Sequence, residues 1–328
     1  MKKAEVMIAT PANARKLQPV HELITSYELS FPVALKFRLG AWAGESAAAD
    51  PPHGNTSERS PAPGAFAFFR MNILVTNDDG IDARGIYELV VALRGIGNVI
   101  VMAPLGEQSA VGHALTVSLP LRVTEFHKNG SFFGFAVSGT PADCVKLALR
   151  TFLSERGLPH PDIVVSGINH GRNTAVNIIY SGTVSAATEA TVLDVPAIAV
   201  SLTSYHPDAD FGPAAEFMRR FTPHVASLGL PRGTLLNVNV PALPTPEIEG
   251  IAYTKQGASF WEDEFEKRVD PQERPYYWLK GRYVLEDKDA DIDDIAIRDR
   301  KISITPIHYD LTNYEFLKKL RSEWPKGF

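Results

Sequence analysis

The sequence predicts an α/β protein: a Rossmann-like parallel sheet sandwiched by helices, with a C-terminal β-ribbon or arm extension. Two observations carry this prediction. From Met71 onward, short apolar runs alternate with segments whose apolar residues recur at helical spacing, an order typical of parallel sheets covered on both faces. After Pro241 this alternation stops, and proline-rich connectors and aromatic stretches follow.

The first half of the predicted sheet contains three strands and a hairpin. A strand at 72–75 leads to a helix at 83–94, in which Ile86, Leu89, Val90 and Leu93 follow the i, i+3, i+4, i+7 pattern. A strand at 98–102 comes next. Segments 121–124 and 132–137 flank an Asn-Gly pair at 129–130, which predicts a β-hairpin.

The second half repeats the alternation. Thr140, Pro141 and Asp143 are typical of a helix start, and this helix is expected to run to about residue 153. The elements expected after it are strands at 163–165, 197–201 and 235–240 and helices at 183–193 and 212–228. Beyond Pro241 we expect a strand at 301–306 and an amphipathic terminal helix at 314–323.

Residues 1–70 differ from the rest of the chain. They are rich in proline and show no strand–helix alternation, so we expect a disordered N-terminal extension, either a tail or translated sequence upstream of the real start. The domain is expected to span 71–328. Within it, 71–241 would form the α/β core and 242–328 the β-ribbon and oligomerisation arm.

The composition excludes several classes of protein. The 328 residues are 45% hydrophobic and 22% charged, as in ordinary globular proteins. A net charge of −5 provides no broad basic field, so we expect no nucleic acid polymer as partner. Cys144 is the single cysteine, which fits a reducing cytoplasm, and its helical spacing with apolar residues places it in the core. No apolar run approaches the roughly 18–20 residues of a membrane span.

Oxygen-bearing side chains follow three predicted strands. Asp78 and Asp79 come after the first, Ser109 after the second, and Asn169 after the strand at 163–165. The carboxyl ends of parallel strands share one edge of the sheet, so these residues should meet in one crevice. Turn formation alone could explain the Asn-Asp-Asp-Gly sequence, and Ser109 alone is an ordinary loop serine. Two adjacent carboxylates repel each other, however, and an oxygen-only set suits Mg²⁺ or Mn²⁺ better than zinc.

A long glycine-rich segment then points to phosphate chemistry. It starts at Ser166 and continues to Ser181-Gly182-Thr183, which open a helix, and βα connections of such length are usually functional. The free N–H groups of a helix N-terminus bind phosphate, although Ser or Thr at this place also serves as a simple N-cap. The two interpretations are compatible. The P-loop, dinucleotide-binding, nucleophile-elbow and HExxH motifs are all absent from the sequence.

Together these loops resemble the SurE family, the stationary-phase survival proteins that act as metal-dependent 5′/3′-nucleotidases. The resemblance covers the chain from Met71 onward and rests on ILVTNDDGI at 73–81, Ala103-Pro104 with Ser109, SGTPADC at 138–144, SGINHGRN at 166–173 and YSGTVSAA at 180–187. It implies that Asp78, Asp79, Ser109 and Asn169 bind one divalent ion per subunit, Mg²⁺ or Mn²⁺. It also implies that Asn173, Ser181, Gly182 and Thr183 line a phosphate site, and that C-terminal arms are exchanged in a homodimer or homotetramer.

The function expected from these patterns is a 5′-nucleotidase, a phosphomonoesterase that hydrolyses nucleoside 5′- and 3′-monophosphates with Asp78 or Asp79 as the catalytic acid or base. The alternative is a nucleotide-binding or sensor module that uses the same pocket without turnover. The second carboxylate favours catalysis, since binding alone does not need it. The sequence leaves open the preferred base, the position of the phosphate, the physiological metal and activity on polyphosphate.

Overall fold

The computed structural model describes residues 71–325, and the extension predicted for residues 1–70 lies outside the described residues. Nine strands of the described chain form one sheet in the order β3-β4-β2-β1-β5-β6-β7-β11-β8. Their bounds are β1 Met71–Thr76, β2 Gly97–Pro104, β3 Val123–Lys128, β4 Ser131–Val137, β5 Ile163–His170, β6 Ala197–Leu202, β7 Thr234–Val240, β8 Ile251–Tyr253 and β11 Ile302–His308.

The middle of this sheet is parallel, which confirms the predicted fold class. β1 pairs in parallel with β2 on one side and with β5 on the other, and β6 and β7 continue outward from β5. Antiparallel pairs occur where β3 joins β4 and where β11 joins β7. The sheet therefore extends from β1 to both sides, through β2 on one side and β5 on the other. Open α/β sheets bind ligands at such a switch in strand order, outside the carboxyl ends of the strands.

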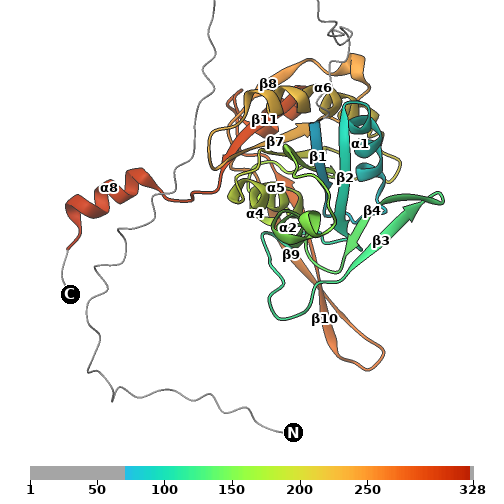
Figure 1. Cartoon of the computed structure of the whole chain (residues 1–328). Coiled ribbons are helices and arrows are strands. Elements are labelled where there is room, and N and C mark those ends of the chain that lie inside the picture. The colour runs from blue at the N-terminus through green and yellow to red at the C-terminus, as the bar shows by residue number, and fades with distance from the viewer. Residues whose placement is uncertain (1–70, 326–328) are drawn as a thin grey trace, which may run out of the picture. The chain divides into compact units, whose positions relative to one another are not determined.

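Helices cover both faces of the sheet (Figure 1). On β1, Ile73 and Val75 belong to one hydrophobic core and Leu74 to the other, because successive side chains of a strand point to opposite faces. The first core contains the apolar residues of α1 (Arg84–Arg94) and α6 (Gly212–Leu228). The second contains those of α2 (Pro141–Leu147) and α5 (Gly182–Val192).

The start of α2 confirms the predicted helix signal. Thr140 accepts a hydrogen bond from the Asp143 backbone, and the Asp143 side chain accepts one from the backbone of Thr140, which completes a capping box. The helix expected up to residue 153 continues beyond α2 as a π-helical turn, Ala148–Phe152, and as α3, Leu153–Glu155. Cys144 is fully buried in the core, as expected.

The C-terminal segment contributes more to the sheet than the sequence indicated. β8 and β11 are strands of the main sheet, so the sheet continues past Pro241. The predicted β-ribbon is present as β9 (Phe260–Val269) and β10 (Pro275–Val284), which pair with each other in antiparallel fashion. The remaining elements are a 3-10 turn at Thr245–Glu247, α7 at Asp293–Arg298 and α8 at Tyr314–Glu323. Within residues 71–325, no helix has the length and apolar character that a membrane crossing requires.

Packing of α1 on β5 depends on Gly85. A Cβ atom at this position would lie 2.0 Å from the carbonyl oxygen of Ile168, in the backbone of a central strand. Gly85→Ala should therefore lower the free energy of unfolding by roughly 1–3 kcal/mol or more. Each kcal/mol corresponds to a decrease of about 2–4 °C in melting temperature. Gly95→Ala at the other end of α1 is the matched control, since its nearest contact would be 3.4 Å. Equal thermal melting of the two variants would contradict this packing.

Candidate functional site

A crevice at the carboxyl edge of the sheet brings the predicted residues together. Its cavity of about 220 Å³ is lined by Asp78, which follows β1, Ser109, which follows β2, Asn169 at the end of β5, and Asn173 and Ser181. The other predicted residues, Asp79, Gly182 and Thr183, lie beside them, as described below. Lining residues to which the sequence assigned no role are Ala110, His170, Arg172, Asn177, Tyr180 and Tyr205.

Asp78 is buried against the N-terminus of α5. Its carboxylate accepts a hydrogen bond from the Thr183 hydroxyl. A Cβ atom on Gly182 would lie 2.7 Å from the Asp78 Cβ, so glycine permits this close approach. Burial raises the pKa of Asp78, while the Thr183 hydroxyl and the backbone amides of Thr183 and Gly182 oppose the shift. The helix end predicted for phosphate binding therefore also holds a buried carboxylate.

Asp79 connects the loop after β1 to the end of β5. Its carboxylate accepts a hydrogen bond of 3.1 Å from the backbone N–H of His170. Burial, followed by the negative charges of Asp78 and Glu107, raises the pKa of Asp79 to about 7, and the His170 amide opposes this. Two neighbouring carboxylates thus lie in a place where their charged forms are costly.

The loop that carries Ser109 is fixed at two places. The backbone N–H of Gln108 donates to the carbonyl oxygen of Asp78 at 2.7 Å, which holds this loop beside the first. Further along, His113 lies 2.9 Å from the Glu189 carboxylate on α5, whose other oxygen is 2.5 Å from the Lys146 ammonium group. His113, for which the sequence did not separate a substrate contact from plain exposure, therefore anchors the loop in this structure.

The Ser109 hydroxyl itself donates to the Glu107 carboxylate at 2.7 Å. Ser109 also lines the crevice. The Ser109 side chain is exposed and does not pack in the protein core.

Asn169 belongs to β5, which is longer than the predicted strand at 163–165 and runs to His170. The pairing of β5 with β6 shifts register between Ser166 and Asn169, an irregularity that changes the direction of side chains at a strand end. The amide nitrogen of Asn169 donates to the carbonyl of Gly171 at 2.7 Å, which orients the side chain. The sequence placed Asn169 at the right edge of the sheet, although in a loop.

Asn173 is held from several sides. Its side-chain nitrogen donates to the Ser201 hydroxyl at 2.9 Å, and its backbone N–H donates to the Asn239 side chain at 2.8 Å. The side chains of Asn237 and Asn239 both donate to its carbonyl oxygen. Buried polar side chains of β6 and β7 therefore fix the position of this loop.

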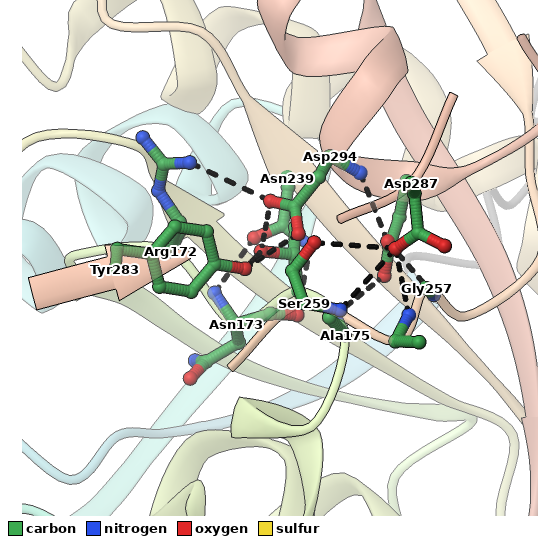
Figure 2. Close-up of polar contacts among 12 residues, drawn as sticks. Arg172, Asn173, Ala175, Asn239, Gly257, Ser259, Tyr283, Asp287 and Asp294 are labelled. Atoms are coloured by element: carbon green, nitrogen blue, oxygen red, sulfur yellow. Dashed lines mark hydrogen bonds and ion pairs between the residues drawn. The ribbon is translucent and has the colours of Figure 1, made fainter. Parts of the chain in front are cut away.

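The C-terminal segment supports the same loop through two buried aspartates. Asp294 accepts hydrogen bonds from the hydroxyls of Thr174 and Tyr283, and its carboxylate lies 3.5 Å from the Arg172 guanidinium (Figure 2). Its neighbour Asp293 accepts from the backbone N–H groups of Ala175 and Gly257. This contact was not predicted from the sequence. Its signal was an Asp pair flanked by isoleucines, Ile292 and Ile295, which indicates burial.

The donor set fits a hard divalent cation. Two carboxylates with raised pKa values lie next to each other, and a cation between them would replace their repulsion with attraction. The remaining predicted donors are a hydroxyl and an amide, and oxygen ligands suit Mg²⁺ or Mn²⁺. Within residues 71–325 no group of three or more His, Cys, Asp or Glu side chains is arranged to hold a metal ion.

The fold and the crevice define a doubly wound α/β protein with an acidic, oxygen-rich site beside a helix N-terminus. Comparison with known proteins agrees. The family model "Survival protein SurE" matches residues 73–263. The chain is 51% identical over 250 residues to the 5'-nucleotidase SurE of Syntrophobacter fumaroxidans, covering 76% of this chain and 98% of the relative. It is 47% identical to that of Chlorobium chlorochromatii, covering 76% and 90%.

A solved structure gives the same result. The crystal structure of the SurE protein from Aquifex aeolicus superimposes with a TM-score of 0.66 at 38% identity, covering 76% of this chain and 98% of that one. The chain therefore belongs to the SurE family.

The raised pKa of Asp79 has a consequence for stability. In the unfolded chain this carboxyl ionises near 3.8, and in the folded protein near 7. Between these values the folded state binds more protons, so the contribution of Asp79 to stability falls as pH rises from about 4 to about 7. Asp79→Asn removes this dependence. In metal-free buffer, the difference in melting temperature between the variant and wild type should increase in favour of the variant as pH rises from about 4 to about 7. Each kcal/mol of unfolding free energy corresponds to roughly 2–4 °C. Above this range the difference should stay constant. A difference that is the same at pH 4 and pH 8 would contradict the burial of this charge.

Proposed function

We propose that this protein is a divalent-metal-dependent 5′-nucleotidase, a phosphomonoesterase that hydrolyses nucleoside 5′- and 3′-monophosphates to nucleoside and phosphate. The proposal is supported by membership of the SurE family, whose relatives include proteins named 5'-nucleotidase SurE. The observation that carries it is the pair Asp78 and Asp79: Asp78 is buried in the crevice against the N-terminus of α5, and Asp79 lies half-buried beside it, held by the His170 amide. The single buried cysteine fits a cytoplasmic enzyme.

Asp78, Asp79, Ser109 and Asn169 would hold one Mg²⁺ or Mn²⁺ per subunit. Such an ion would supply positive charge to a phosphoryl oxygen and so withdraw electrons from the bond that breaks. The chain itself keeps the four donors in place through the hydrogen bonds from Gln108 and His170 and through the contact of Thr183 with Asp78.

Asn173, Ser181, Gly182 and Thr183 would bind the phosphate of the substrate. The N-terminus of α5 offers backbone N–H groups and the positive end of a helix dipole, which favour an anion. Ser181 is the N-cap and accepts from the backbone of Val184 at 3.0 Å, so it keeps the first turn of the helix in position. Arg172 also lines the crevice and adds a positive charge.

We assign proton transfer to Asp79. Its carboxylate is held by the His170 amide, so one oxygen is oriented by the protein. Asp78 already accepts from the Thr183 hydroxyl, which leaves it less able to exchange a proton.

The activity is tested by phosphate release from nucleoside monophosphates with Mg²⁺ or Mn²⁺. Asp79→Asn should reduce turnover by at least about 100-fold, the lower range for loss of a positioned acid or base, without loss of fold. Asp82→Asn is the matched control. Asp82 is exposed, pairs with Lys128 and lies outside the crevice, so its variant should keep wild-type activity.

EDTA should abolish phosphate release by the wild-type enzyme, and added Mg²⁺ or Mn²⁺ should restore this activity. Restoration by zinc alone would contradict the oxygen-ligand site. Tight binding of nucleotide without any phosphate release would favour the alternative, a nucleotide-binding or sensor module.

We also propose that the protein is a homodimer or homotetramer assembled through its C-terminal arm. Helix α8 has no buried residue, and the exposed fractions of Leu311 and Tyr314 are 93% and 59%. Most apolar residues of the ribbon β9–β10 are exposed as well. Elements that cannot bury an apolar face on their own domain commonly bury it on another copy.

Removal of the residues after Asp310 should lower the assembly state and the melting temperature by several degrees, because interfaces stabilise through mass action. Phe316→Ser on α8 should weaken assembly in the same direction. Leu228→Ser, which changes an exposed leucine at the end of α6, should not. Light scattering that reports a full-length monomer at micromolar concentration would overturn the assembly proposal.

A further inference from the structure

Arg172 brings a permanent positive charge to the crevice. Among the described residues that line this cavity, it is the only Lys or Arg. An arginine presents five N–H donors in a planar fork, which matches the oxygen atoms of a phosphate group. Its side chain is also long and rich in rotamers, so ordering it costs conformational entropy. The value of Arg172 to a bound anion therefore depends on what holds its guanidinium in place.

Two groups of the C-terminal segment hold this guanidinium. Its Nη1 atom lies 3.5 Å from the Asp294 carboxylate, and no other carboxylate within residues 71–325 forms an ion pair with Arg172. The Arg172 Cζ atom also lies over the ring of Tyr283, 5.2 Å from the ring centroid, as in a cation–π contact. Figure 2 shows the three side chains together. The Arg172 side chain is 30% exposed, so it reaches the cavity while these contacts restrain it.

Asp294 has the properties of a fixed anchor. Its side chain is 1% exposed, and its carboxylate accepts hydrogen bonds from the hydroxyls of Thr174 and Tyr283. One donor lies in the crevice loop and the other on β10, so rotation of the carboxylate would break at least one of these bonds. A buried carboxylate also favours a cation beside it. The contact with Arg172 uses one N–H group, which leaves the other donors of the fork for a ligand.

We propose that Asp294 is a positioning residue that acts through Arg172: it keeps the guanidinium at the crevice, where Arg172 binds the phosphate group of the substrate. This inference rests on the proposed function and adds to it a dependence of substrate binding on a side chain 122 positions further along the chain. Asp294 is not among the residues that line the crevice. If it acts only through Arg172, the two residues form one unit, and the effects of changing them should not add.

The test is a double-mutant cycle with adenosine 5′-monophosphate and Mn²⁺. Arg172→Ala should raise KM roughly 10- to 150-fold, the range for a lost hydrogen bond to a charged group. Asp294→Asn keeps the shape of the side chain but removes the charge that holds Arg172, so KM should rise about threefold or more. The kcat of Asp294→Asn should change less than about twofold, because Arg172 binds the anion in the ground and transition states alike. In the Arg172→Ala background, Asp294→Asn should change KM less than about twofold.

Asp287→Asn is the matched control. Asp287 belongs to the same segment and accepts from the backbone N–H of Ala258 at 2.7 Å, and in the described structure it forms no hydrogen bond or ion pair with Arg172. This variant should lower the melting temperature and leave KM within about twofold of wild type. A rise in KM equal to that of Asp294→Asn would overturn the inference, because it would show a general loosening of the segment.

Three results for Asp294→Asn would also overturn the inference. An unchanged KM would show that Arg172 needs no anchor. A lower KM would show that the carboxylate only weakens the positive charge of Arg172. An increase in KM that persists in the Arg172→Ala background would show that Asp294 acts through the fold of the loop.

If Asp294→Asn does not fold, Tyr283→Phe replaces it, since this change keeps the ring beside Arg172 and removes a hydroxyl that fixes Asp294. It should raise KM in the wild-type background and not in Arg172→Ala, and an unchanged KM in both would overturn the inference. If no phosphate is released from the nucleotide, the proposed function fails, and binding of inorganic phosphate with Mn²⁺ is measured by calorimetry instead. Arg172→Ala and Asp294→Asn should each weaken this binding without adding. Additive losses, or no binding by wild type, would overturn the inference.

Discussion

The structure depends on the burial of two adjacent carboxylates at the end of a central parallel strand. Asp78 is buried and Asp79 is half-buried beside it. Burial raises the pKa of both carboxyls, and the charge of Asp78 raises that of Asp79 further, so the charged forms of the pair are costly. Much of the neighbouring architecture reduces this cost. The Thr183 hydroxyl, the first amides of α5 and the backbone of His170 all donate to the two carboxylates. The same donors place the pair beside a helix N-terminus, where an anionic substrate is also favoured.

A site of this kind needs rigid loops, and the fold supplies them from distant parts of the chain. Glu189 on α5 holds the loop of Ser109 through His113, and its other carboxylate oxygen pairs with Lys146 of α2. Asparagines of β7 hold the loop of Asn173. Asp294, more than 110 positions further along, reaches the same loop through Thr174 and Arg172. The C-terminal segment therefore supports a loop of the crevice through Tyr283 and Asp294, and it also presents an exposed ribbon and helix.

Sequence reasoning found the parts of the site that follow from strand order. Asp78, Ser109 and Asn169 follow or end neighbouring parallel strands, and the shared edge of such strands placed them together before any contact was known. It did not find features that depend on long-range pairing. The addition of β8 and β11 to the main sheet is one example, since residues 251–308 lack the alternation that marks a parallel unit. The contacts of Asp294 with Thr174 and Arg172 are others, because each requires a partner far away in sequence.

We propose that Asp78, Asp79, Ser109 and Asn169 form one divalent-cation site. The most direct measurement is an anomalous difference map from a crystal soaked in Mn²⁺, collected together with one from an Asp78→Asn crystal. We expect one strong peak per subunit, between the side chains of Asp78, Asp79 and Asn169 and within reach of Ser109, and its loss or marked weakening in the variant. A strong peak elsewhere in the chain with none in the crevice would show that these four residues do not form the cation site. An undiminished peak in Asp78→Asn would do the same.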